Sequence, residues 1–296
     1  MICDSPFVKG VRAFPCGKCV PCLLKRRKIW MHRLMLESLL HGDKTFMTLT
    51  YSDEKLPLTP DGKGTLEPGH IRDFLKRLRY HMKCKLRFYC AGEYGDESWR
   101  PHYHLIVYGY PNCLRGMSMY SKVRTKCCSS CDGVKEIWGY GNVFLAEVSE
   151  ATAMYTAGYL MKKLTRFDNP LLEGRHPEFA RMSLKPGLGA DALHDVGSVL
   201  MQHQLEVTLP DVPSGLRHGP RVSPYGRYLR KKLRVIVGKD EKAPLDVEQE
   251  KEVFALLARS IASKEGLSVG KQLAKENKGA SFSLQGKMKL KQRRSL

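Results

Sequence analysis

Apolar and polar positions along the chain follow two periods, one typical of strands and one typical of helices. Short apolar or aromatic stretches bounded by glycine, proline or polar residues predict strands within residues 45–53, 86–95, 100–109 and 139–148. Apolar residues at helical spacing predict helices within residues 23–42, 67–83, 149–164 and 246–266. The order strand, helix, strand, strand, strand, helix predicts an α+β fold, with helices packed on an antiparallel sheet of about five strands.

The predicted strand at residues 100–109 carries two histidines, His102 and His104, at positions where apolar residues would favour a core. Because side chains of a strand point to alternate faces, both histidines share one face. The strand at residues 86–95 comes just before, so antiparallel pairing would bring Glu93 close to the histidines. Two imidazoles and a carboxylate are a candidate metal site with positions open for substrate. Histidines that are merely satisfied by hydrogen bonds within a sheet are the alternative.

The predicted helix at residues 149–164 carries two tyrosines one turn apart, Tyr155 and Tyr159, with Lys162 on the same stripe and Lys163 at its edge. A phenol has a pKa of about 10, so it is a poor nucleophile at neutral pH unless its target is polarised. A metal can polarise a phosphodiester, and a lysine can stabilise the developing charge. The two motifs together indicate phosphotyrosyl chemistry. An amphipathic packing stripe with a solvated rim is the alternative.

Charge points to a polyanionic partner. The 296 residues include 50 Lys and Arg against 30 Asp and Glu, a formal net charge of +20, and 42% are hydrophobic, which is enough for a core. Release of counterions from nucleic acid favours binding of such a chain, although a basic protein without this partner is the alternative. Neither a membrane-spanning apolar run nor a signal-peptide core occurs, so we expect no membrane partner and a cytoplasmic location.

Several basic residues are candidates for contacts with nucleic acid, although a solvated face would use the same residues. Residues 216–234 interleave arginine and lysine with aromatic residues, which suits backbone contact and base stacking. The tail at residues 278–296 is basic and low in aromatic residues, and we expect it to be disordered. The candidate contact residues are Arg26, Arg27, Arg100, Lys163 and Arg230.

Ten cysteines in a chain expected to be cytoplasmic favour free thiols or metal ligands over disulfides. Cys16, Cys19 and Cys22 have C-x2-C-x2-C spacing with Gly and Pro between them, and Cys3 could be a fourth ligand. This spacing predicts a tight knuckle that holds a structural Zn2+ ion, with an iron–sulfur cluster as the alternative.

A second group of cysteines lies in a Gly-, Ser- and Cys-rich insertion at residues 111–135. It could hold its own Zn2+, complete the first group, or carry reduced thiols without a metal. Its members are Cys113, Cys127, Cys128 and Cys131.

The motifs occur in a familiar order. FMTLTY (46–51), GEYG (92–95), RPHYHLIVYG (100–109) and the paired-tyrosine helix resemble the HUH endonucleases, and most closely the replication initiators of small single-stranded DNA phages, the microviruses. CGKCVPC (16–22) and MSLKPGLG (182–189) resemble the gokushovirus-like branch. The resemblance covers residues 16–164 and continues more weakly to residue 234. It implies the palm-like sheet of that family.

The resemblance also implies the chemistry. Mg2+ or Mn2+ would be held by Glu93 and the two histidines, and Tyr155 or Tyr159 would attack origin DNA to form a 5′-phosphotyrosyl link. The strand would later be rejoined in rolling-circle replication. The phage pattern has a lysine directly before the second tyrosine, whereas this chain has Gly158, which leaves Lys162 as the candidate.

The implied partners are single-stranded origin DNA and the host replication machinery, within the cytoplasm of the bacterial host. The chain contains no glycine-rich phosphate-binding loop, so a host helicase would have to unwind the duplex. No feature specifies an oligomeric state. A transposase or plasmid initiator of the HUH type, and a non-catalytic zinc-knuckle protein that binds nucleic acid, are the alternatives.

The same observations divide the chain into four regions. We expect a cysteine-rich knuckle and the start of a basic helix at residues 1–30, and an endonuclease core at 31–170 that includes the insertion. A basic accessory region at 171–238 and a helix with the basic tail at 239–296 follow.

Overall fold

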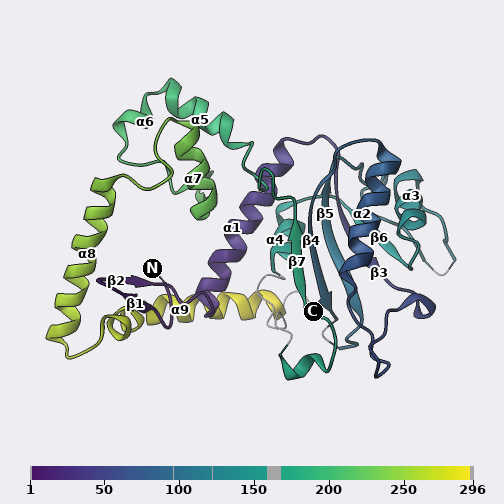
Figure 1. The fold of residues 1–296 in the computed structure, drawn as a ribbon, viewed down its shortest axis with the longest axis horizontal. Helices are drawn as coiled ribbons and strands as arrows, with labels where there is room; N and C mark the ends of the chain where they lie inside the picture. The colour runs from purple at the N-terminus through teal and green to yellow at the C-terminus, as the bar shows by residue number, and fades with distance from the viewer. Residues whose placement is uncertain (1, 96, 122, 159–167, 294–296) are drawn as a thin grey trace. The chain divides into compact units, whose positions relative to one another are not determined.

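The computed structural model describes residues 2–95, 97–121, 123–158 and 168–293, and the chain forms two compact units (Figure 1). One unit consists of residues 30–192, and the other consists of the parts of the chain on either side. Helix α1 (Val20–Leu39) passes from one unit into the other after Ile29. Among the described residues, no helix has both the length and the apolar character needed to cross a membrane.

The unit of residues 30–192 is built on a five-stranded sheet in the order β6-β3-β5-β4-β7, in which every neighbouring pair is antiparallel. The α+β class and the strand number predicted from the sequence are confirmed. The strands are β3 (Lys44–Thr50), β4 (Arg87–Tyr94), β5 (Pro101–Tyr108), β6 (Val143–Ala146) and β7 (Phe179–Met182).

Helices cover both faces of this sheet. Figure 1 shows α2 (Pro68–Met82) and α3 (Ser129–Trp138) on one face and α4 (Glu150–Gly158) on the other. Apolar side chains of β3, β4 and β5 are buried against α2 and α3 on the first face, and others are buried against α4 and the second half of α1. Each fully buried Leu, Ile or Phe contributes about 1.5–3 kcal/mol, so burial on both faces fixes the strand register.

Helix α2 shows how the sequence pattern selects the buried face. The Glu67 carboxylate caps the helix by accepting a hydrogen bond from Gly69 N at 2.8 Å, and Pro68 occupies the first turn, where no backbone donor is needed. Apolar residues spaced by three or four along the helix face the sheet. They are Ile71, Phe74, Leu75 and Leu78, all buried.

The loop at residues 183–190 is fastened to α1 by a buried polar network. The Glu37 carboxylate pairs with the Arg87 guanidinium and accepts a hydrogen bond from Gly189 N at 2.7 Å. Arg87 also donates to Pro186 O at 2.9 Å, and Arg33 Nε donates to Leu188 O at 3.0 Å. With β7, this loop extends the sheet unit to residue 192, beyond the core boundary expected at residue 170.

Replacing Gly189 with alanine is expected to destabilise the sheet unit by about 3 kcal/mol. Gly189 has a φ of +77°, and a Cβ there would lie 2.8 Å from Arg33 O. The positive φ costs about 1–2 kcal/mol and the clash adds about as much. Gly174 is a matched control, since its φ is +81° but nothing lies within 4 Å of an added Cβ. Urea unfolding of both variants would separate the two effects, and equal losses would contradict the clash.

The other unit contains two β-hairpins and several helices, of which α8 confirms the helix predicted at residues 246–266. The pairs β1–β2 and β8–β9 form the hairpins. The elements are β1 (Phe7–Lys9), β2 (Arg12–Phe14), α5 (Leu193–Gln202), α6 (Leu205–Thr208), β8 (Gly215–His218), β9 (Arg221–Pro224), α7 (Gly226–Ile236), α8 (Leu245–Lys264) and α9 (Val269–Arg293). Short 3-10 helices at Asp53–Lys55 and Pro170–Leu172 belong to the sheet unit.

Helix α9 differs from the disordered tail that composition predicts at residues 278–296. Lysine, glutamine, leucine and methionine have high helix propensity, and composition alone does not register that preference. The helix also has partners within its unit, since the Ser281 hydroxyl donates to the Asp4 carboxylate. Gly270 lies against Pro6 O, where an added Cβ would be only 2.8 Å away.

Candidate active site and thiol clusters

Glu93, His102 and His104 converge on the face of the sheet that α4 covers. In the β4–β5 pairing Glu93 lies opposite His102, and Ala91 lies opposite His104. Glu93 Oε1 is 2.7 Å from His102 Nε2 and 3.1 Å from His104 Nε2. The predicted proximity of Glu93 to the histidines is therefore confirmed. We call these three residues the Glu/His site, and their role as metal ligands stays a prediction.

The second nitrogen of each imidazole is also held. His102 Nδ1 is 3.0 Å from Arg100 O, and His104 Nδ1 is 3.0 Å from Thr48 Oγ1. Because a backbone carbonyl accepts only, His102 Nδ1 must carry a proton. In a neutral imidazole Nε2 is then a lone pair facing the Glu93 carboxylate, a repulsive contact that a proton or a metal cation between them relieves.

The surroundings favour the charged form of this carboxylate. Burial by itself would raise the pKa of Glu93, but hydrogen bonds and charge from the two histidines lower it to about 2. Glu93 and His104 are buried, whereas His102 is partly exposed and faces the edge of the site. An ionised carboxylate beside two imidazole nitrogens is an oxygen and nitrogen donor set that suits a divalent cation, so these residues fit such an ion.

Helix α4 brings Tyr155 to the Glu/His site. The helix begins at a reciprocal cap, in which Thr152 N donates to Ser149 Oγ at 3.2 Å and Ser149 N donates to Thr152 Oγ1 at 2.8 Å. The Tyr155 and His104 rings are 5.1 Å apart at 82°, and the Tyr155 side chain is 49% exposed. A ring that both touches a histidine of the site and faces solvent is accessible to a bound strand.

The other predicted residues of this helix, Tyr159, Lys162 and Lys163, lie outside the described residues. Their roles stay predictions.

Two functional neighbours were not predicted from the sequence. Thr48 holds His104 Nδ1, and the Phe46 ring lies 5.8 Å from the His104 ring and 6.2 Å from the Tyr155 ring. Both belong to β3, which pairs with β5 so that Thr48 lies opposite His104. Threonines at alternate positions of the stretch FMTLT are the sequence signal that could have identified a polar face here.

The basic residues predicted to contact nucleic acid have different surroundings. Arg26 is exposed, and its guanidinium donates to Gly17 O at 3.3 Å. Arg27 is partly buried. Two others engage acidic partners within the protein, Arg100 with Asp53 at 2.7 Å and Arg230 with Asp211. These two arginines therefore have less free charge than the sequence suggests, and their contacts with nucleic acid stay predictions.

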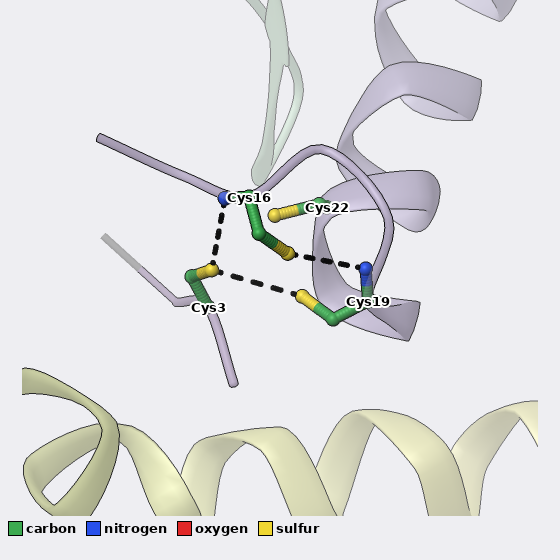
Figure 2. Close-up of side chains that lie close together, drawn as sticks. All are labelled: Cys3, Cys16, Cys19 and Cys22. Atoms are coloured by element: carbon green, nitrogen blue, oxygen red, sulfur yellow. Dashed lines mark hydrogen bonds between the residues drawn. The ribbon is translucent and has the colours of Figure 1, made fainter. Parts of the chain in front are cut away.

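Cysteines of the N-terminal region form one cluster, shown in Figure 2. Its four sulfur atoms lie within 4.8 Å of one another, and the Sγ atoms of Cys3 and Cys19 are 3.8 Å apart. Backbone amides donate to the sulfurs, from Cys16 N to Cys3 and from Cys19 N to Cys16, both at 3.3 Å. This N-terminal cluster, Cys3, Cys16, Cys19 and Cys22, could hold a metal ion.

The thiols of this cluster differ in acidity. Burial opposes ionisation of Cys16, but amide donors from Lys18 and Cys19 lower its pKa to about 6. Burial and its neighbour Cys19 raise the pKa of Cys22 to about 12. Because the thiolate is the form that binds a metal, Cys16 is prepared for coordination at neutral pH.

The insertion carries a second set of four thiols within 4.8 Å of one another, and we name it the insertion cluster. Each cluster is complete, so neither requires a ligand from the other. Burial raises the pKa of Cys131, whereas the pKa of Cys128 is lowered to about 7 because backbone and thiol hydrogen bonds outweigh its burial. The members are Cys113, Cys127, Cys128 and Cys131.

Comparison with known proteins identifies relatives for this arrangement. Residues 44–164 match the family model of replication-associated protein ORF2. Replication-associated protein ORF4 of Chlamydia phage 1 is 31% identical over 236 residues, which cover 76% of this chain and 55% of the relative. Replication-associated protein ORF2 of Spiroplasma virus 4 is 33% identical over 184 residues, 59% of this chain and 55% of the relative.

Replication-associated protein VP4 of Bdellovibrio phage phiMH2K is 30% identical over 160 residues, 51% of this chain and 49% of the relative. The chain thus spans about half the length of the curated relatives it matches. No solved structure matches it. The matched residues 44–164 contain the Glu/His site, helix α4 and the insertion cluster. The resemblance to phage replication-associated proteins is confirmed, and residues 44–164 form a domain of the ORF2 replication-associated protein family.

Proposed function

We propose that this protein initiates rolling-circle replication of a small phage genome by nicking single-stranded origin DNA through a tyrosine. The observation that carries this proposal is the position of Tyr155, whose ring lies 5.1 Å from His104 of the Glu/His site. A hydroxyl that reacts with a phosphodiester needs a polarised target beside it, and three potential ligands of a divalent cation lie next to this phenol. The phage replication proteins among its relatives support the same role.

The Glu/His site would hold Mg2+ or Mn2+ through Glu93, His102 and His104. A cation bound there supplies Lewis-acid polarisation of the scissile phosphate. The protein's part is to fix the donors, because Arg100 O and Thr48 Oγ1 orient the two imidazoles through their Nδ1 atoms.

The tyrosine chemistry conserves the energy of the bond that it breaks. The phenol oxygen of Tyr155 or Tyr159 forms a bond to phosphorus while the bond to the 3′-oxygen breaks, and the phenol proton is lost as the 3′-hydroxyl is formed. The 5′ end then stays on the protein, and the free 3′-hydroxyl can prime synthesis. A second tyrosine allows the regenerated origin to be cut, after which the released 3′-hydroxyl attacks the first link. Lys162 would stabilise the charge that develops on phosphorus.

Affinity for DNA would come from the basic side chains, with Arg26, Arg27 and Lys163 as contacts to phosphates. Arg100 and Arg230 would contribute through the charge that their acidic partners leave uncompensated. The basic accessory region at residues 171–238 would add contacts to the DNA backbone, and a host helicase would unwind the duplex.

The N-terminal cluster would bind one structural Zn2+ ion. Four cysteines with tetrahedral spacing and amide donors to sulfur are typical of closed zinc sites, which contribute to folding and take no direct part in chemistry. Zinc content should fall by one equivalent in the variant Cys19→Ser, and an unchanged content would contradict this assignment.

Replacing Thr48 with valine is expected to lower the nicking rate about 10–100-fold, the usual effect of removing an outer partner of a metal-binding histidine. Valine keeps the shape of threonine but cannot bond His104 Nδ1. Thr50→Val is the matched control, because the Thr50 hydroxyl lies on the same strand, 3.5 Å from Asn142 O. In a Mn2+ titration of the nicking rate, Thr48→Val should need more Mn2+ than the control. Equal rates and equal Mn2+ dependence in the two variants would remove Thr48 from the site.

Covalent capture of DNA tests the proposed function. Incubation with a labelled single-stranded origin oligonucleotide and Mn2+ should give a gel shift that survives denaturant, and EDTA should prevent it. A non-catalytic zinc-knuckle protein would bind the oligonucleotide without forming a denaturant-resistant complex. Strand transfer on circular and linear substrates would separate a phage initiator from a transposase.

A further inference from the structure

The insertion cluster has no part in the DNA chemistry, yet its sulfur atoms have the spacing of a metal site. Cys113 Sγ lies 3.8 Å from Cys127 Sγ and 3.8 Å from Cys128 Sγ. Sulfurs bound at about 2.3 Å to one tetrahedral zinc ion are about 3.8 Å apart, whereas a disulfide holds its sulfurs at about 2.05 Å. The spacing therefore fits four thiolates around one ion and does not fit a disulfide.

The surroundings hold these sulfurs in place. Cys128 is the N-cap of α3 and Cys131 lies in its first turn, so both thiols are at the positive end of the helix dipole. Met119 N donates to Cys127 Sγ at 3.4 Å. The Asp132 carboxylate ties the loop together by accepting hydrogen bonds from Cys127 N at 3.0 Å and Tyr120 OH at 2.6 Å. Such outer contacts are typical of built metal sites.

The same arrangement occurs at the N-terminal cluster, in an unrelated part of the sequence. There Cys19 directly precedes α1 and Cys22 lies in its first turn, the same C-x2-C placement as Cys128 and Cys131 at α3. In each cluster two further thiols come from the preceding chain. Two independent loops that bring four thiols together at a helix start are poorly explained by packing alone.

We propose that Cys113, Cys127, Cys128 and Cys131 bind a second structural Zn2+ ion, distinct from the one at the N-terminal cluster. Soft thiolates select zinc over Mg2+ or Mn2+, so this site would not compete for the ion of the Glu/His site. Binding releases the remaining thiol protons to solvent. The assignment does not depend on the proposed nicking activity.

The ion would fasten the insertion to the edge of the sheet. Ser118 lies between Cys113 and Cys127 in the sequence, and its amide donates to Leu145 O at 2.8 Å while its hydroxyl accepts from Leu145 N at 2.8 Å. Met117 forms an isolated β-bridge with Ala146. Strand β6 leads within four residues into α4, which carries Tyr155. Loss of the ion should therefore loosen β6 and, through it, the start of the tyrosine helix.

Zinc content of the full-length chain tests this proposal. Elemental analysis of protein produced with added zinc should give two equivalents for the unaltered chain, one for Cys128→Ser, one for Cys19→Ser and none for the double variant. Cys84→Ser is the matched control, because Cys84 is an exposed thiol outside both clusters, and it should retain two. Two equivalents in Cys128→Ser, or iron with labile sulfide in place of zinc, would overturn the proposal.

A second measurement covers the case in which Cys128→Ser does not fold. Cys127 and Cys128 are partly exposed, so burial alone would not protect them from alkylation. In the zinc-loaded native chain, peptide mass mapping should find both protected from iodoacetamide, and a thiol-competing chelator should make both reactive. Cys84 should react in either state. Equal modification of Cys127 and Cys128 with and without the chelator would overturn the second site.

Discussion

Replacing His104 with alanine is expected to lower the nicking rate by about 1000-fold or more while largely sparing affinity for single-stranded DNA. The loss of a direct ligand should exceed the 10–100-fold effect typical of outer contacts. His104 is buried between Glu93 and Thr48, so its removal also leaves the Glu93 carboxylate with one imidazole instead of two. Affinity should persist because contacts between basic side chains and phosphates supply it.

The matched control for this variant is His70→Ala. His70 is a partly buried histidine of the same unit, bonded to Tyr51 OH at 2.9 Å beneath α2, on the opposite face of the sheet. Loss of an imidazole there tests whether any partly buried histidine is needed. Single-turnover nicking and fluorescence anisotropy with the same oligonucleotide would give rate and affinity separately. Cleavage by His104→Ala at the rate of the His70→Ala control would remove the histidine from the mechanism.

The tyrosines should show a different pattern, in which single substitutions leave partial activity. Tyr155→Phe and Tyr159→Phe should each retain some covalent attachment to DNA, and the double variant should have none. Phenylalanine keeps the ring contacts of Tyr155 with His104 and Phe46, so a loss of attachment reports the hydroxyl. Neither single variant should cut and rejoin a circle, since that cycle needs two nucleophiles.

Tyr80→Phe is the control for these variants, because Tyr80 is 86% exposed on α2, on the opposite face of the sheet. Denaturing gels would measure attachment, and circular product would measure rejoining. A single-tyrosine enzyme would give the opposite pattern. One substitution would then abolish all attachment, and the other would leave even circle closure unchanged.

The sequence predicts the centre of the sheet well because strong local signals agree there. The short connection between β4 and β5 permits only a few registers, and one of them brings Glu93 opposite His102. Alternation then sorts the histidines onto one face and Tyr103 and Leu105 onto the other. The candidate ligands follow from these two local rules.

Other features depend on partners that are distant in the sequence. Strand β7 is only four residues long and lies near prolines and glycines, and its pairing with β4 alone defines it. Arg100 and Arg230 are visible as charges, but only the fold shows that Asp53 and Asp211 partly neutralise them. Convergence of Cys113 with Cys127 likewise requires closure of a loop that carries no periodic signal.

Identification of the residue that becomes linked to DNA tests the central claim most directly. Full-length protein would be incubated with a single-stranded origin oligonucleotide and Mn2+, digested with nuclease and protease, and mapped by mass spectrometry. We predict a nucleotide adduct on the phenol oxygen of Tyr155 or Tyr159, absent when EDTA is added. An adduct on any other residue, or covalent attachment that persists in EDTA, would contradict attack by these tyrosines at the Glu/His site.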